Sequence, residues 1–104
     1  MRIGVFTVLF QDLPFEKMLD RVASAGITAV EIGAGGYPGS HHCPVDELLA
    51  SEQKRKAYRA AIESRGLVLS GLSCHYEPLS PDPVLARESD MVYRKAVRLA
   101  APLP

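Results

Sequence analysis

Two different spacings of hydrophobic residues alternate along the chain. Short segments rich in β-branched and aromatic residues predict strands at 2–10, 27–33 and 67–75. Between and after them, apolar residues recur every three or four positions, as on one face of a helix. This spacing predicts a helix between Asp12 and Gly26, a short helical turn at 45–50, a helix at 52–65 and a last helix from Asp82 to Pro102. The predicted elements therefore follow the order β-α-β-α-β-α.

Residues that favour helix ends mark the boundaries of these helices. Asp12, Ser51 and Asp82 are predicted N-caps, because each side chain can accept a hydrogen bond from a free backbone N–H in the first turn. A proline follows Asp82 at the first helical position, where its missing N–H costs nothing. Gly26 and Gly66 come just before strands and are expected to end the first and third helical segments.

The order of the elements predicts an α/β protein with a parallel sheet. Alternating strands and helices join parallel strands by right-handed crossovers, which fits either an open doubly wound sheet or part of a (β/α)₈ TIM barrel. The units repeat about every 35 residues, and eight of them would need on the order of 250 residues. We therefore interpret residues 1–104 as a single partial domain, the first three units of a TIM barrel, with an open sheet edge after the third strand.

Composition and charge narrow the class of protein. Twelve basic and twelve acidic residues give a net charge of +0, so the chain lacks the basic field typical of nucleic-acid binding. No apolar run reaches the roughly 20 residues of a membrane span. Gln11 and Asp12 interrupt the first apolar run and no cleavage site follows, which argues against an export signal. A cytoplasmic protein whose two cysteines are free thiols is the expected class.

The strands are expected to have one apolar face and one polar or small face. Side chains alternate across a strand, so Glu31 shares a face with Gly33, and His75 shares a face with Gly71. Both polar residues lie toward the carboxyl ends of their strands, where parallel α/β folds place ligand sites. A carboxylate in an apolar strand is costly to bury unless it is paired, so Glu31 is expected to have a functional or ion-paired role.

All histidines and cysteines also fall near these carboxyl ends, at His41, His42, Cys43, Cys74 and His75. Imidazole groups bind divalent metals or move protons. His41 and His42 are adjacent, so at most one of them is expected to point inward. His75 is expected either in a site or in a structural hydrogen bond. The cysteines are expected to act as small buried hydrophobic residues, because no Cys-x-x-Cys spacing supports a zinc site.

The glycine-rich segment at 33–39, GAGGYPG, is the other conspicuous motif. It lacks the Lys-Ser/Thr pair of a P-loop and the spacing of a dinucleotide-binding fingerprint, and no helix begins directly after it. We interpret it as part of a flexible loop over a pocket, spanning 34–44.

Taken in order, four segments resemble the N-terminal part of the sugar phosphate isomerase/epimerase family, a group of xylose isomerase-like TIM barrels. The segments are IGVFTVLF at 3–10, AVEIGAGGYPG at 29–39 with HHCP after it, ESRGLVLSGLSCH at 63–75 and PLSPDP at 78–83. The resemblance covers essentially the whole chain. It is specific at the level of the superfamily and does not identify a substrate.

The resemblance implies an aldose–ketose isomerase or epimerase that acts on a small sugar or sugar phosphate. In such enzymes a divalent metal (Mn, Mg, Co or Zn) stabilises an enediolate while a carboxylate moves a proton. The family's main metal ligands and catalytic glutamates come from later strands, so the isolated chain is expected to be inactive. Phe6, Glu31 and His75 are the expected substrate-binding residues, and His42 and His75 are the candidate metal ligands within this chain.

Two other functions compete with this one. A small α/β binding or assembly module would pair its open sheet edge with another chain and perform no chemistry. An apurinic endonuclease of the same superfamily is the third hypothesis, and the neutral net charge counts against it. In either barrel interpretation, Phe6 and Leu69 are expected on the uncovered face of the sheet. Exposure of that face predicts self-association, aggregation or marginal folding of the isolated chain.

Overall fold

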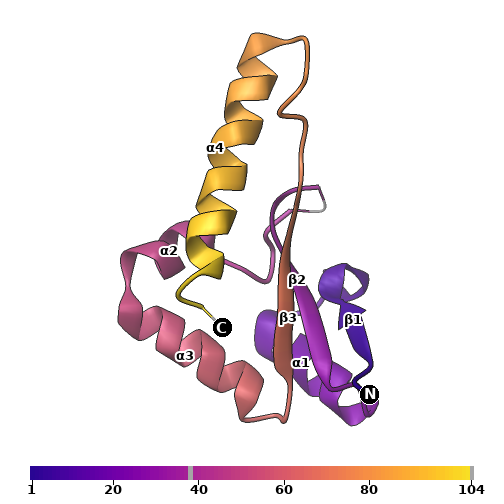
Figure 1. Ribbon diagram of the computed structural model, residues 1–104. Helices are drawn as coiled ribbons and strands as arrows, with labels where there is room; N and C mark the ends of the chain where they lie inside the picture. Colours follow the sequence, from indigo (N-terminus) through magenta and orange to yellow (C-terminus); the bar gives the residue numbers. More distant parts are fainter. Residues whose placement is uncertain (38, 104) are drawn as a thin grey trace.

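The computed structural model describes residues 1–37 and 39–103 and contains a three-stranded parallel sheet interleaved with helices (Figure 1). In chain order the elements are β1 (Gly4–Phe6), the 3₁₀ helix η1 (Thr7–Phe10), α1 (Phe15–Ser24), β2 (Ala29–Gly36), α2 (Val45–Ala50), α3 (Glu52–Glu63), β3 (Val68–His75) and α4 (Pro83–Ala100). The strand order is β1-β2-β3, and both neighbouring pairs are parallel. The predicted α/β class and the order β-α-β-α-β-α are confirmed.

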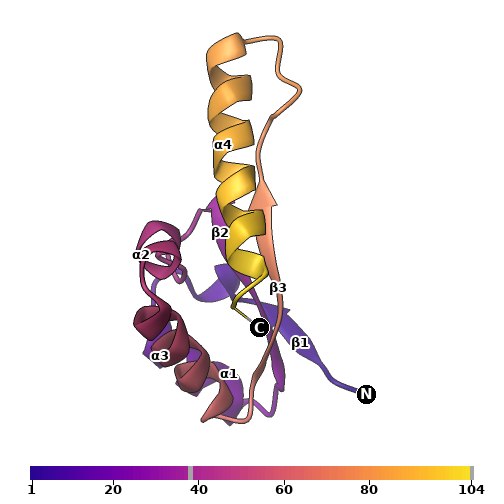
Figure 2. The same cartoon turned by 60° about the vertical axis from the view of Figure 1, so that its left-hand side comes forward.

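The hydrophobic core lies between the sheet and the helices, which gather on one side of it (Figure 2). Most of its members come from the four α-helices and β2: Met18, Leu19 and Val22 of α1, Val30, Ile32 and Ala34 of β2, Leu48 of α2, Tyr58 and Ile62 of α3, and Ala96 and Leu99 of α4. Burying these side chains is the main stabilising contribution to folding. None of the helices among the described residues has the length and apolar character that a membrane span requires.

The opposite face of the sheet has no helical layer. Along it, Gly4 and Glu31 are exposed and Phe6 is half-buried, while Val30 and Ile32 on the helical side are fully buried. In β2 this contrast agrees with the predicted division into an apolar face and a small or polar face, although the small residues Ala29 and Gly33 beside Glu31 are buried as well. Parallel sheets are ordinarily covered on both faces, so the uncovered face is unusual for this class of fold.

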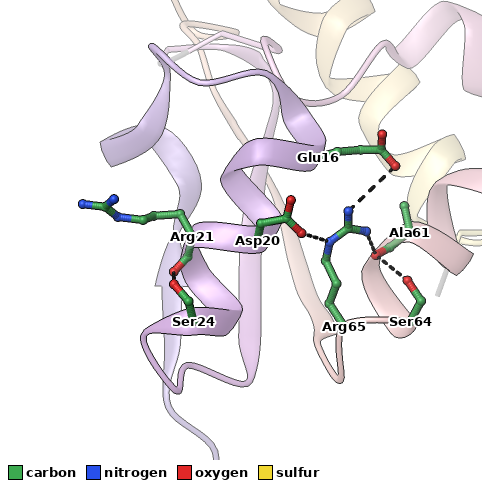
Figure 3. A network of polar contacts seen from close by, with 7 residues as sticks. All are labelled: Glu16, Asp20, Arg21, Ser24, Ala61, Ser64 and Arg65. Carbon is green, nitrogen blue, oxygen red and sulfur yellow. Dashed lines mark hydrogen bonds and ion pairs between the residues drawn. The ribbon is translucent and has the colours of Figure 1, made fainter.

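An ionic contact joins α1 to the end of α3 beneath the sheet (Figure 3). Arg65 Nε lies 2.6 Å from Asp20 Oδ1, and the same guanidinium donates to the Ala61 carbonyl at 2.7 Å. Glu16 is at the edge of the contact, 3.9 Å from Arg65. The Arg65 side chain is 21% exposed, so the pair is partly shielded from water, and it fixes the position of the turn that leads into β3.

Several predicted boundaries of the first and second strands are wrong. The strand expected at 2–10 pairs with β2 only over Gly4–Phe6. Thr7–Phe10 forms a 3₁₀ helix, in which the buried Thr7 hydroxyl contacts His42. The strand expected at 27–33 begins at Ala29 and continues to Gly36, so half of the glycine-rich segment is strand and not loop. Position 38 of that segment lies outside the described residues.

The helix ends follow the predictions except at α1. Ser51 accepts the Lys54 N–H and Asp82 accepts the Val84 N–H, as N-caps do. The predicted cap Asp12 is wrong: α1 begins after Pro14, whose carbonyl accepts the first helical hydrogen bond without any side-chain cap. Gly26 and Gly66 have φ angles of 79° and 72°, the left-handed conformation that ends a helix.

A β-bulge in β3 reverses the predicted face of Leu69. Val30 pairs with Leu69 and Glu31 pairs with Gly71, so Ser70 is the extra residue between them. The Ser70 hydroxyl donates to the Val30 carbonyl at 3.0 Å. Because of this extra residue, Leu69 packs against the core on the helical side, and its expected place on the uncovered face is wrong.

Two glycines at the end of β2 allow other segments to approach closely. A Cβ at Gly35 would lie 2.4 Å from Val92 of α4, and a Cβ at Gly36 would lie 2.3 Å from the His75 carbonyl oxygen. Their φ angles, 139° and 65°, are also ones that other residues rarely adopt. These positions therefore need glycine if α4 and the end of β3 are to lie against β2.

Replacing Gly35 by Ala is expected to lower the free energy of unfolding by about 2 kcal/mol or more, because the new methyl group meets Val92 in addition to the backbone strain. Gly39→Ala is the matched control, since Gly39 also has a positive φ but open space around it, and about 1 kcal/mol is expected there. Urea unfolding followed by circular dichroism measures both. Equal losses would show that α4 does not press on Gly35.

Candidate functional site

The three strands bring Phe6, Glu31 and Gly71 side by side across the uncovered face. Phe6 pairs with Glu31, and Glu31 pairs with Gly71. A Cβ built at Gly71 would lie 4.0 Å from Glu31 Cγ, an ordinary van der Waals contact, so the two residues are direct neighbours on this face. The Ser73 hydroxyl donates to Glu31 Oε1. The Glu31 carboxylate is therefore held over β3, with one oxygen engaged by the protein.

Of the two roles expected for Glu31, functional or ion-paired, the ion-paired role does not agree with its surroundings among the described residues. Its side chain is exposed, and its hydrogen-bond partner is a hydroxyl group. Burial would have been costly for a charge with no cationic partner, and the open face removes that cost because water can still solvate the carboxylate. The exposed oxygens are available to accept hydrogen bonds from a ligand on this face.

His75 ends β3 and stands where β2 and β3 diverge. It pairs with Gly36, and its carbonyl accepts the Tyr37 N–H at 2.6 Å, so its backbone is fixed while its side chain is exposed. It borders two cavities: a cleft of about 820 Å³ toward the start of α4 and a groove of about 370 Å³ that Glu31 also lines. The groove brings together two of the predicted substrate-binding residues, Glu31 and His75. Phe6 borders a separate, smaller cavity.

His42 is buried and has both ring nitrogens engaged. Nε2 donates to the Leu13 carbonyl at 2.8 Å, because a carbonyl oxygen can only accept. In the neutral ring Nδ1 then accepts from the Thr7 hydroxyl at 3.3 Å. Tyr58 donates to the His42 carbonyl at 2.8 Å, which ties the loop to α3 as well. A metal at His42 would have to displace one of these partners, so the geometry favours a structural role.

The two histidines and the two cysteines differ in their exposure to solvent. His42 points inward and His41 is exposed, which confirms that at most one of the pair lies inside. Both cysteines are free, as predicted. Cys43 is fully buried, and this burial raises the pKa of its thiol to about 11, so it is not a nucleophile at neutral pH. Cys74 is half-buried, and burial raises the pKa of its thiol too.

The described His, Cys, Asp and Glu side chains form no group that could hold a metal ion. Among residues 1–37 and 39–103, no three His, Cys, Asp or Glu side chains are placed to hold one ion. The two predicted candidates, His42 and His75, border different cavities. His75, exposed at the end of its strand, is the one whose ring is accessible to a metal or a substrate.

Three tyrosines that the sequence analysis did not identify line the 820 Å³ cleft beside His75. Tyr37 follows β2, Tyr76 follows β3, and Tyr93 lies on α4. The first two are each the residue directly after a strand, and that position is the signal that could have revealed them. Tyr93 is far from both in the sequence and meets them only because α4 packs along the sheet.

Comparison with known proteins gives one relative and no family. The chain is 40% identical over 81 residues to a Bacillus subtilis (strain 168) protein named "Uncharacterized protein YfiH", a match that covers 78% of this chain and 26% of YfiH. The chain thus spans about a quarter of the length of the curated relative it matches. No family model matches the chain. The matched stretch is 81 residues long, so at most 23 of the 104 residues can precede or follow it. Wherever it begins, it therefore includes residues 24–81, and with them Glu31 and His75.

Replacing His42 by Ala is expected to lower the free energy of unfolding by about 2–4 kcal/mol, because the Thr7 hydroxyl and the Leu13 carbonyl lose their partners in a buried place. His41→Ala, one residue away and exposed, should change it by less than about 0.5 kcal/mol. Chemical unfolding of both variants measures the difference. A stable His42→Ala variant would contradict the structural role assigned to His42.

Proposed function

We propose that this chain forms the first three units of a TIM-barrel enzyme that isomerises or epimerises a sugar or sugar phosphate. The observation that supports it best is the row of Phe6, Glu31 and Gly71 across the uncovered face, with His75 at the carboxyl end of the third strand. Phe6 and His75 end β1 and β3, at the edge where catalytic barrels hold their ligands, and Glu31, the third residue of β2, lies beside Phe6. The family resemblance of the four sequence segments points in the same direction.

The size of the relative is compatible with a complete barrel. The 81 matched residues make up 26% of YfiH, and 81 ÷ 0.26 gives a length of about 310 residues, which exceeds the roughly 250 residues of eight β/α units. On this proposal, the rest of the barrel supplies the main metal ligands and the catalytic glutamates. The isolated chain is then inactive, because it holds only one arc of the site.

Phe6, Glu31 and His75, the predicted substrate-binding residues, each make one kind of contact with the sugar on this proposal. The Phe6 ring offers an apolar surface to one face of the sugar, and the free oxygens of Glu31 accept hydrogen bonds from its hydroxyl groups. His75 can donate to a sugar oxygen or exchange a proton with it. A divalent metal (Mn, Mg, Co or Zn), when bound by residues of the other units, would stabilise the negative charge on adjacent sugar oxygens. A cytoplasmic location belongs to the same proposal and agrees with two free cysteines.

A non-catalytic assembly module is the second candidate, and the free edge of β3 favours it. Val68 on that strand is 40% exposed, and Val97 on the adjoining face of α4 is 52% exposed. An unpaired strand beside apolar side chains is a place where another strand adds readily. We infer that the isolated chain associates with itself through this edge.

A chimera tests the enzymatic proposal. The segment of YfiH that matches this chain is replaced by the corresponding 81 residues, and the chimera is incubated with aldoses, ketoses and their phosphates in D₂O. We expect deuterium to enter the carbon next to the carbonyl, as measured by NMR, because an enediolate exchanges that proton with solvent. Glu31→Gln should lower kcat/KM by roughly tenfold to a hundredfold, since one charged hydrogen bond to the substrate is lost.

The control is Glu63→Gln, which removes a carboxylate from the outer side of α3, where it contacts Arg59 only at the surface. This variant should exchange deuterium at the rate of the unmodified chimera. A folded chimera that exchanges no proton on any of these sugars, in conditions where YfiH does, would contradict the proposal. Equal activity of the Glu31 and Glu63 variants would exclude Glu31 from the site.

A further inference from the structure

The cleft of about 820 Å³ at the carboxyl ends of β2 and β3 has an aromatic lining. Tyr37, Tyr76 and Tyr93 reach it from three separate segments, and their side chains are 78%, 39% and 54% exposed. His75 and Glu77 are the titratable non-aromatic groups at its wall apart from the Cys74 thiol. We call these three tyrosines, with His75 and Glu77, the tyrosine cleft.

Close backbone contacts hold the walls of the tyrosine cleft in place. The N–H of Tyr37 donates to the His75 carbonyl at 2.6 Å, which joins the ends of β2 and β3. Ser89, fully buried on α4, accepts the Glu77 N–H at 3.1 Å and donates to the Leu85 carbonyl at 2.6 Å. The loop after β3 is therefore attached to α4, and the cleft between them is formed before any ligand arrives.

The cationic side chains of this chain lie away from the tyrosine cleft. The chain has twelve Lys and Arg residues, and apart from Arg2 all of them lie on α1, α3 and α4 or, for Arg65, directly after α3. We call the groove of about 370 Å³ that Glu31 and His75 line the Glu31 groove. Among the described residues, no Lys or Arg lines either this groove or the tyrosine cleft. Phosphate groups are usually held by such side chains, so an anionic ligand would meet Glu77 without a compensating charge.

We propose that the tyrosine cleft binds the uncharged ring of a sugar, and that it does so without recognising a phosphate group. Tyrosine rings offer flat apolar surfaces to the C–H groups of a sugar ring, and their hydroxyls offer hydrogen bonds to its oxygens. His75 links the cleft to the Glu31 groove, because it borders both. The class of ligand rests on the proposed function, whereas the location and the preference for an uncharged ring rest on the cleft itself.

The absence of tryptophan makes the cleft directly observable. Three of the four tyrosines line it, and the fourth, Tyr58, is buried. Titrating the full chain with D-glucose, D-fructose and D-glucose 6-phosphate should therefore change tyrosine fluorescence in a saturable way for the two free sugars, with millimolar affinity. D-glucose 6-phosphate should bind no more tightly than D-glucose.

Variants assign the binding to named residues, with saturation-transfer NMR as a second readout because the substitutions remove fluorophores. Tyr37→Ala and Tyr93→Ala should each weaken binding of D-glucose by about fivefold to tenfold. Met91→Ala is the matched control: Met91 is 55% exposed on the same helix but does not line the cleft, and its loss should change nothing.

The possible outcomes separate this inference from the proposed function. Sugar binding that survives both tyrosine substitutions but is lost in Glu31→Gln would overturn the tyrosine cleft and leave the isomerase proposal intact. Tighter binding of D-glucose 6-phosphate than of D-glucose would overturn the preference for an uncharged ring. If neither free sugar binds the wild-type chain, the inference is wrong, and activity of the chimera still decides the proposed function independently.

Discussion

The uncovered face of the parallel sheet is the constraint on which the rest of this molecule depends. The helices bury Val30 and Ile32 of the central strand on one side, whereas Glu31 between them lies exposed on the other. A parallel sheet gains most of its stability from being covered on both faces. Here the second face carries the half-buried Phe6, the Glu31 carboxylate and small residues (glycines, Ala29 and Ser73), so it is too polar and too small to serve as an ordinary core. Those residue types fit the interior rim of a larger barrel, where side chains meet a ligand.

Local irregularities of the strands place the functional side chains. The bulge at Ser70 keeps Leu69 and Leu72 in the core while it leaves Gly71 opposite Glu31. At the end of β2, Gly35 and Gly36 admit α4 and the end of β3 to van der Waals distance. The tyrosine cleft and the Glu31 groove thus meet at the carboxyl end of β3, where His75 borders both.

The order of elements, the parallel sheet and the place of His75 at the end of β3 could be predicted, because hydrophobic period and helix caps are local properties. The expectation that Glu31 lies toward the carboxyl end of its strand is wrong, because β2 continues to Gly36 and Glu31 is its third residue. The bulge could not be predicted, since LVLSGLSCH alternates equally well without it and only the pairing with β2 shows that Ser70 is extra. The structural role of His42 also depends on distant partners, Thr7 and Leu13, that the sequence does not bring together. For the same reason the contribution of Tyr93 to the cleft was missed.

We propose that this sheet is an arc of a larger barrel; among residues 1–37 and 39–103, β2 is the strand that pairs with β3. Sedimentation velocity over a wide range of protein concentration, combined with urea unfolding at each concentration, tests it most directly. The account predicts that the isolated chain associates as concentration rises and that its unfolding midpoint rises with it, because association covers the free edge. A chain that stays monomeric throughout, with one sharp midpoint independent of concentration, would contradict the account.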